Sequence, residues 1–491
     1  MRTAGILMPF SSLPARYGIG NLGKEAYRFI DFLDECDQSY WQILPMGPTG
    51  FGDSPYQNFS AFACSPYYID PDILADEGYI SKEDIKEADF TENAERVDYS
   101  DLYTKRFPLL KKACENVSEE DSAYKDYVEG NRFWIEDYAL YMAVKEENGM
   151  RPFRDWERSV QTREDEAMEQ AKDRLKKDIH FWKSVQFLFH QQWMKLRSYA
   201  ASKNVKIIGD IPIYVSEDSC EAWMRPELFQ TGSDGKLLRV AGCPPDDFST
   251  EGQLWGNPLY DWDHHKETGY EWWIKRLEHW GCFYDVIRID HFRGFSGYYS
   301  IPAGNINAVE GEWKEGPGKD LITAIKEKVP WLPIIAEDLG TNTEDVEELL
   351  KYSGFPGMKI LQFAFSSDWN NEHLPHNYEK TCVAYTGTHD NASTEEWVQT
   401  APEDQTEKAK KYLSVHDKSD LTDAMIRAVL ASTADMAVIP IQDWLRTGAG
   451  SRINTPSTIG ENWVWRVSSD MFTDELKSKI RELTEIYGRG R

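Results

Sequence analysis

The sequence lacks several features that would assign it to a large class of proteins. It has no apolar run of roughly 18 residues, the length that crosses a membrane. Its seven cysteines are odd in number, scattered and without a C-x-x-C pair, which argues against a disulfide framework and a zinc cluster. Basic residues are also few, with 55 Lys and Arg against 83 Asp and Glu. The resulting net charge of −28 argues against nucleic acid and anionic membranes as partners.

Other missing features concern targeting and cofactors. The first ten residues, Met1–Phe10, hold only a short apolar stretch before Ser, Pro and Arg, which is not the pattern of a signal peptide. We therefore expect a cytoplasmic protein. No glycine-rich phosphate loop or Lys/Arg cluster follows a strand-like run, so no nucleotide site is indicated. Aromatic residues, in contrast, are abundant, with 18 Trp and 25 Tyr, and they offer flat apolar surfaces for cores or for ligands.

What the sequence does contain is a recurring apolar run that ends in polar or glycine-rich residues. The runs are short, continuously apolar and rich in Ile and Val, as expected of parallel strands buried on both faces. Several are separated by helical patterns such as residues 23–37. The eight runs are Gly5–Pro9, Tyr40–Pro45, Val205–Val215, Asp285–Gly294, Pro333–Gly340, Gly357–Phe363, Val383–Asp390 and Ala437–Leu445. This alternation predicts an α/β protein with a (β/α)8 TIM barrel, although a doubly wound sheet would give a similar pattern.

Two gaps between runs are too long for simple crossovers. Residues 65–203 are charged, rich in Tyr and Trp and mostly helical in pattern, whereas residues 216–280 are irregular and interrupted by Gly and Pro. We expect the whole chain, residues 1–491, to form one catalytic barrel with these two segments as insertion subdomains. They should lie at the C-terminal rim of the barrel, where loops carry function in this fold.

If these runs are barrel strands, acidic residues stand at the ends of several of the strands. Asp210 lies in the third run, Asp290 in the fourth, Glu337 and Asp338 in the fifth, and Asp390 in the seventh. Barrel chemistry is built at such strand ends. A single acid there could instead cap a helix, and this is the preferred interpretation of Asp338 or Asp210 taken alone. Acids at three strand ends together favour a catalytic cluster.

Two of these acids have different surroundings. Side chains alternate along a strand, so Arg288 points the same way as Asp290 and should keep that carboxyl ionised, as a nucleophile requires. Glu337 follows the apolar residues 334–336, where burial should raise its pKa and suit it to act as a general acid. Two such carboxyl groups, with a third acid to grip the distorted ring, are what glycoside chemistry needs.

The sequence resembles the amylomaltase family of 4-α-glucanotransferases, also called disproportionating enzymes, which are relatives of the α-amylase superfamily. The resemblance covers nearly the whole chain, with the matching segments in the family's order. They are Gly5–Gly23, Trp41–Ala63, Gly209–Val215, Val240–Trp262, Asp285–Phe295, Ile334–Gly340, Tyr385–Asn391 and Arg452–Arg466. Any one of the shorter segments would be weak evidence, but their combination is specific.

The resemblance implies roles for the strand-end acids. Asp290 is implied to be the nucleophile, Glu337 the acid/base, and Asp390 the residue that holds the 2- and 3-hydroxyls of the sugar in the transition state. Arg288 and His389 are implied to support this triad directly.

It also implies residues that bind the substrate. Asp210 resembles the family's structural and sugar-contacting aspartate. The other expected cleft residues are Ser54, Tyr56, Trp255, Phe248, and the loop from Asn454 to Pro456, which should close over the site. The chain departs from some relatives at Asp247, where an aromatic residue is expected, so the rim loop should keep one aromatic contact, Phe248, rather than two.

The implied activity is the transfer of a segment of an α-1,4-glucan to the 4-hydroxyl of an acceptor glucose or maltodextrin. The expected partners are maltooligosaccharide and α-glucan donors and acceptors. Transfer exchanges one α-1,4 bond for another, so neither cofactor nor metal is expected. Three alternatives stay open: a hydrolase with the same triad, a non-catalytic glucan-binding protein and a nucleotide-sugar synthase. The complete triad argues against the second, and the missing phosphate loop against the third.

Overall fold

The computed structural model describes residues 2–90, 95–232, 235–245, 250–340 and 343–491. In this part of the chain, eight parallel strands form one sheet in the order β10-β11-β12-β1-β2-β3-β6-β9. The strands are β1 (Thr3–Leu7), β2 (Tyr40–Gln42), β3 (Lys206–Ile211), β6 (Val286–Ile289), β9 (Ile334–Ala336), β10 (Gly357–Ile360), β11 (Cys382–Tyr385) and β12 (Met436–Pro440). Each of the eight apolar runs in the sequence overlaps one of them.

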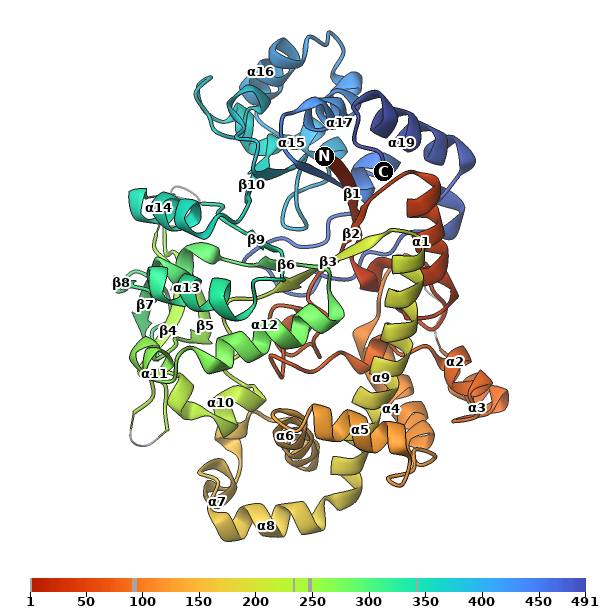
Figure 1. Ribbon diagram of the computed structural model, residues 1–491, viewed down its shortest axis with the longest axis vertical. Helices are drawn as coiled ribbons and strands as arrows, with labels where there is room; N and C mark the ends of the chain where they lie inside the picture. The colour runs from red at the N-terminus through yellow and green to blue at the C-terminus, as the bar shows by residue number, and fades with distance from the viewer. Residues whose placement is uncertain (1, 91–94, 233–234, 246–249, 341–342) are drawn as a thin grey trace.

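The two outer strands of this sheet, β9 and β10, lie close enough to complete a nearly closed barrel. The amide of Ala336 donates to the carbonyl of Pro356 at 3.0 Å across the seam. The predicted (β/α)8 TIM barrel is therefore confirmed, and the doubly wound alternative is wrong. The two chain ends also lie side by side on the barrel (Figure 1), where the Arg489 side chain donates to the Thr3 carbonyl at 3.0 Å.

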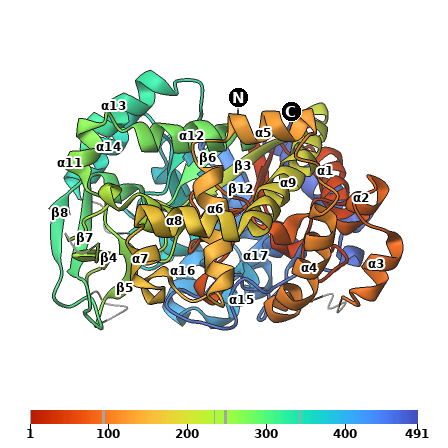
Figure 2. The same cartoon turned by 90° about the horizontal axis from the view of Figure 1, so that it is seen from below.

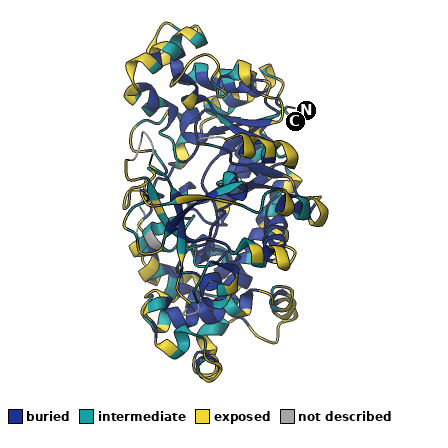
Figure 3. Cartoon of the chain, turned by 90° about the vertical axis from the view of Figure 1, so that its left-hand side faces the viewer, coloured by how far each residue is buried: buried dark blue, intermediate teal, exposed yellow. Residues whose placement is uncertain are grey.

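Helices surround the barrel in a ring, and most of them contact the next helix of the ring. The ring consists of α1 (Lys24–Glu35), α9 (Lys176–Ser202), α12 (Glu271–Phe283), α13 (Gly318–Lys328), α14 (Glu344–Ser353), α17 (Leu421–Ala431) and α19 (Asp474–Ile486). The connection from β10 to β11 holds only short 3-10 turns among its residues, all of which are described. The ring helices bury their inner faces, while exposed residues concentrate on the outer surface of the molecule (Figure 3).

The long segment between β2 and β3 is helical. Besides α9 it contains α2 (Pro71–Asp76), α3 (Lys82–Glu87), α4 (Tyr99–Cys114), α5 (Ser122–Gly130), α6 (Ile135–Glu147), α7 (Arg158–Gln161) and α8 (Asp165–Arg174). Because α9 contacts α1, α12 and β3, it serves as the barrel helix that returns the chain to β3. The helices before α9 extend away from the barrel (Figures 1 and 2). Their separation as a subdomain stays a prediction.

The second long segment and the residues after β6 form an antiparallel sheet that the sequence analysis does not predict. Its order is β5-β4-β7-β8, with β4 (Arg239–Cys243), β5 (Gln253–Pro258), β7 (Gly297–Pro302) and β8 (Glu312–Glu315). It lies beside the barrel at the left of Figure 2. The remaining described α-helices are α10 (Cys220–Met224) and α11 (Trp262–Glu267) at the rim, and α15 (Thr394–Thr400), α16 (Glu403–Leu413) and α18 (Ile441–Leu445).

Side chains inside the barrel change from apolar to charged along the strands. A separate apolar cluster fills the interior: Leu7, Ile208, Val286, Ile335, Met358, Ile360, Val383, Tyr385 and Val438. Because side chains alternate, the residues two positions beyond Ile208, Val286 and Ile335 point the same way. Those residues are Asp210, Arg288 and Glu337. The strand pattern therefore places charged groups next to the apolar cluster, on its side toward the C-terminal end of the barrel. Within the described residues, no helix has both the length and the apolar character to cross a bilayer.

Candidate active site

The strand register brings the candidate carboxylates together. On β3 and β6, Asp210 is paired with Arg288, and on β6 and β9, Ile289 is paired with Ala336. The residues that follow this last pair are Asp290 and Glu337, and the Glu337 amide donates to the Ile289 carbonyl at 3.0 Å. Since neighbouring strands are about 4.8 Å apart, the two carboxylic residues project from adjacent points of one rim.

Arg288 connects two of the acids. Its guanidinium donates to both carboxylate oxygens of Asp210, at 2.8 and 2.7 Å, and forms an ion pair with Asp290 at 3.1 Å. The Asp210 side chain is 0% exposed, whereas that of Asp290 is 28% exposed. Asp290 is thus open to a ligand. Asp210 is closed to solvent, and it influences the site through the side chains that it bonds to. The predicted Arg288–Asp290 pair is present, but the main partner of Arg288 is Asp210.

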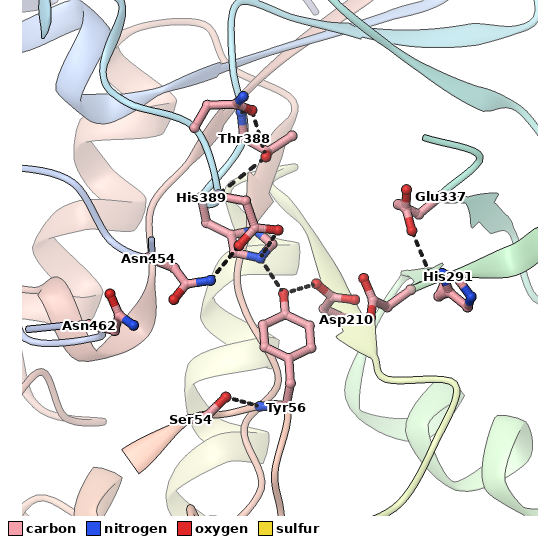
Figure 4. Close-up of polar contacts among 12 residues, drawn as sticks. Ser54, Tyr56, Asp210, His291, Glu337, Thr388, His389, Asn454 and Asn462 are labelled. Carbon is pink, nitrogen blue, oxygen red and sulfur yellow. Dashed lines mark hydrogen bonds and ion pairs between the residues drawn. The ribbon is translucent and has the colours of Figure 1, made fainter. Parts of the chain in front are cut away.

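Tyr56 joins this cluster to the opposite wall. Its hydroxyl donates to Asp210 at 2.7 Å and lies 2.9 Å from Nε2 of His389, and the two rings stack with centroids 5.2 Å apart. Burial raises the pKa of Tyr56 well above its usual value, so the phenol keeps its proton. Because that proton goes to Asp210, His389 is the donor to the Tyr56 oxygen. Figure 4 shows Tyr56 between Asp210 and His389.

Glu337 is almost completely buried and is held by main-chain groups. One of its oxygens accepts from the amide of His291 at 2.7 Å and the other from that of Leu339 at 2.8 Å. Burial raises the pKa of Glu337, while Arg288 and these two amides act in the opposite direction. Burial also raises the pKa of Asp290, against the attraction of Arg288. Of these two acids, only Asp290 forms an ion pair with Arg288. A single proton shared by Asp290 and Glu337 therefore belongs on Glu337.

Asp390 is held from the loop that follows β12. Asn454 donates from its side chain to a carboxylate oxygen of Asp390 at 2.6 Å, and Arg452 donates to the Asp390 carbonyl at 2.6 Å. The Asp390 side chain is 44% exposed, which leaves its carboxylate open to hydroxyl groups of a ligand. Its neighbours Thr388 and Asn391 bond to each other instead: the Asn391 side chain accepts from the Thr388 amide and hydroxyl at 2.8 and 2.9 Å.

A cleft of about 560 Å³ unites most of the expected site residues. It is lined by Ser54, Tyr56, Trp255, Asp290, His389, Asp390, Asn454 and Pro456. Glu337 lies at one side beside His291, and Asn454 and His389 lie at the other (Figure 4). Phe248 and Asp247 lie outside the described residues. Among the described residues, no group of three or more His, Cys, Asp or Glu side chains could hold a metal ion.

The helix-cap interpretation of two acids is wrong. Asp210 bonds to Arg288 and Tyr56, and Asp338 accepts from the amide of Met358 at 2.6 Å in the next strand. The nearest following helices are instead preceded by Ser219, whose side chain accepts from Ala222, and by Thr343. Both acids therefore connect adjacent strands below the cleft.

Several cleft residues are not among those expected from the sequence. Tyr214, Asn462 and Trp463 line the cleft, and Trp463 approaches the ring of Tyr56 at 5.7 Å. His291 lines it too, and its contact with Glu337 is through the main chain. Nothing in the residue types signals these positions. In the structure, two of these positions stand out by their backbone. The φ angle is 54° at His291 and 65° at Trp463, values that bulky residues rarely adopt.

Comparison with known proteins agrees with this arrangement. A family model described as 4-alpha-glucanotransferase, glycoside hydrolase family 77, matches residues 8–472. A 4-alpha-glucanotransferase of Clostridium butyricum is 46% identical over 485 residues, covering 98% of this chain and 100% of the relative. One of Streptococcus pneumoniae is 44% identical over 492 residues, covering 99% and 97%.

The structure itself has a similar solved counterpart. An amylomaltase from Streptococcus agalactiae in complex with acarbose superimposes with a TM-score of 0.97 at 43% identity, and each chain is covered completely. The similarity therefore includes the barrel, the helical segment between β2 and β3 and the antiparallel sheet.

Proposed function

The chain belongs to the 4-alpha-glucanotransferase family, enzymes that act on α-1,4-glucans, and on this premise we propose a retaining double displacement for its reaction. Asp290 attacks the anomeric carbon while Glu337 protonates the leaving oxygen, which gives a covalent glycosyl-enzyme. The 4-hydroxyl of an acceptor then attacks, Asp290 leaves, and Glu337 takes the hydroxyl proton. The observation that carries this proposal is the register of β6 and β9, which places the two carboxylic residues on adjacent strand ends. Retaining enzymes need their carboxyl groups only about 5 Å apart.

The surrounding residues fit the two sides of this reaction. Asp390, His389 and Asn454 face Glu337 across the cleft, so they are suited to hold the ring that is being transferred. Trp255 contacts His291, whose amide bonds to Glu337, so Trp255 lies on the side of the leaving group. The acceptor enters where the leaving group departs. We therefore assign Trp255 to the acceptor side, with maltooligosaccharides and longer α-glucans as donors and acceptors. The solved amylomaltase with acarbose, an oligosaccharide mimic, supports this substrate class.

Transfer rather than hydrolysis is the first expected result. Water is present at roughly 55 M, but a well-oriented acceptor can reach effective concentrations of about 10⁵ M or more. With purified maltotriose, glucose release should greatly exceed the gain in reducing ends, because transfer conserves reducing ends. Glucose assay and reducing-sugar assay on the same samples measure the two quantities. Reducing ends that rise in step with bond cleavage, with acceptor abundant, would mean hydrolysis.

A variant of the acceptor side sharpens this test. Trp255→Ala should lower the ratio of transfer to hydrolysis more than it lowers bond cleavage, because it removes an acceptor surface and neither carboxylate. Trp331→Ala is a matched control, since Trp331 is 56% exposed and precedes β9 at the opposite end of the barrel. Tyr56 is unsuitable here, because its hydroxyl bonds to Asp210 and His389 and its removal would disturb cleavage itself.

The charge of Arg288 should control the acid limb of the pH profile. Asp290 must be ionised to attack, and the nearby guanidinium favours that form. In Arg288→Met the pKa of Asp290 should rise, so the acid limb of kcat/KM should move to higher pH. Arg288→Lys, which keeps a positive charge, should move it less. An acid limb that stays in place in folded Arg288→Met would show that Arg288 does not hold the nucleophile ionised.

The same substitution should reduce stability. Asp210 is fully buried and would lose its main partner, and leaving one charge of a buried pair unpaired costs about 3–5 kcal/mol. The pH profile is therefore measured at a temperature where circular dichroism shows the variant to be folded.

A further inference from the structure

His291 has an unusual backbone at a decisive point of the site. It directly follows Asp290 and has φ 54° and ψ 46°, in the left-handed region. A residue with a Cβ rarely occupies this region, and where one does at a functional site the surrounding structure has to hold it there.

The conformation directs main-chain groups at the acid/base. The His291 amide donates to Oε2 of Glu337 at 2.7 Å, and the next amide, of Phe292, donates to the Glu337 carbonyl at 2.9 Å. On the other side, the Leu339 amide donates to Oε1 at 2.8 Å. Each oxygen of the carboxyl group therefore receives one fixed donor, and the plane of the group is set. Figure 4 shows the His291–Glu337 bond.

The side chain of His291 explains what holds this backbone. Its ring meets that of Trp255 edge to face, with centroids 4.8 Å apart, and lies 6.3 Å from the ring of Tyr214. Burial, with Arg293 nearby, lowers the pKa of His291 to about 3, so the ring is neutral at working pH and acts by packing. Both aromatic neighbours line the cleft. The backbone that orients Glu337 is thus anchored on the acceptor wall.

We propose that His291 is a positioning residue that couples acceptor binding at Trp255 to the orientation of Glu337. This inference rests on the proposed function. In the second half of the reaction the acceptor oxygen bonds to the anomeric carbon, the bond to Asp290 breaks, and the hydroxyl proton passes to the Glu337 carboxylate. An amide that donates to that carboxylate stabilises the base form that this step uses. An acceptor that packs on Trp255 also fixes the His291 ring, and through it the amide.

Two substitutions at His291 separate the backbone from the ring. Asparagine tolerates the left-handed region, whereas β-branched valine does not. His291→Val should therefore move the amide away from Glu337, while His291→Asn should keep it and lose the contact with Trp255. Each variant is assayed with maltotriose and with maltotriosyl fluoride, whose leaving group needs no proton.

The expected results differ between the two variants. His291→Val should lose roughly tenfold more activity on maltotriose than on the fluoride, because proton transfer is impaired. Its alkaline limb of kcat/KM should move to higher pH, since loss of a donor raises the pKa of Glu337. Arg288, Asp290, Asp338 and Arg293 are the charged neighbours, and all stay unchanged. His291→Asn should keep the alkaline limb of the wild type and show a lower ratio of transfer to hydrolysis.

Equal losses on both substrates with an unshifted limb in folded His291→Val would overturn the proposal. If that variant does not fold, Trp255→Ala tests the coupling from the other side. It removes the ring that holds His291, and histidine adopts the left-handed region less readily than asparagine, so the alkaline limb should again move to higher pH. An unshifted limb there would also overturn it. Glu337→Gln distinguishes a failure of this proposal from a failure of the proposed function. If Glu337→Gln keeps activity on the fluoride and the His291 variants lose it, the acid/base assignment stands and only the coupling is wrong.

Discussion

Asp290→Asn is expected to lower the rate of maltotriose disproportionation by on the order of 10⁴- to 10⁶-fold, the range found when a covalent nucleophile is removed. An amide oxygen is a poor nucleophile and a poor leaving group, so neither half of the reaction can proceed. The fold should remain, because Arg288 keeps both hydrogen bonds to Asp210 and no buried charge loses its main partner. Initial rates and thermal unfolding, measured on the same preparation, give the two quantities.

The strand that carries Asp290 also supplies the control. Asp285 stands at the opposite end of the same segment, where its carboxylate accepts from the Ile207 amide at 2.9 Å and pairs with Arg197. Asp285→Asn should reduce stability slightly and leave the rate within a few-fold of the wild type. When the reaction of the wild type with an activated donor is quenched during turnover, mass spectrometry should detect a glycosyl adduct on Asp290. A folded Asp290→Asn that retained a tenth of the wild-type rate would show that another group attacks.

The barrel could be predicted from the sequence because its signal is local. Parallel strands buried on both faces are continuous apolar runs, and each of the eight runs overlaps a strand of the barrel. The antiparallel sheet has no such signal. Its edge strand β8 is Glu-Trp-Lys-Glu and is exposed throughout, and the other edge strand, β5, is exposed or half-buried over its first four residues. These strands exist because they pair with β4 and β7, and pairing between distant segments does not appear in the pattern of either one.

In the candidate site, too, one part could be predicted from the sequence and another part could not. Acids at strand ends follow from the strand pattern, so Asp290, Glu337 and Asp390 could be placed on one rim in advance. Their partners could not, because they depend on side-chain geometry between distant residues. Asn454 bonds to Asp390 across 64 residues and Tyr56 to Asp210 across 154. Even Arg288, which is close to Asp290 in sequence, bonds mainly to Asp210. That contact depends on the register of β3 and β6, which the sequence pattern does not give.

Glu337→Gln should separate substrates by the leaving group they carry. A glucan oxygen leaves only if it is protonated, so the variant should lose on the order of 10²- to 10⁴-fold on maltotriose, the usual contribution of a general acid. Fluoride leaves without a proton, so the first step with maltotriosyl fluoride should be much less affected. Glutamine can still accept from the His291 amide or the Leu339 amide through its carbonyl oxygen, but its amino group would face the other donor, so a modest loss of stability is also expected.

The second half of the reaction gives the same variant a further signature. Without a base the acceptor hydroxyl attacks slowly, so the glycosyl-enzyme formed from the fluoride should accumulate as a burst of fluoride release followed by slow turnover. An anion that needs no base, such as azide, should then restore turnover and yield an α-glycosyl azide, since two inversions retain the configuration. Asp338→Asn is the matched control: its carboxyl neighbours Glu337 in sequence but bonds to the Met358 amide outside the cleft lining, and its variant should show neither burst nor azide rescue. If Glu337→Gln slowed the fluoride and maltotriose equally and azide restored nothing, Glu337 would not be the acid/base, and the double displacement would need another proton carrier.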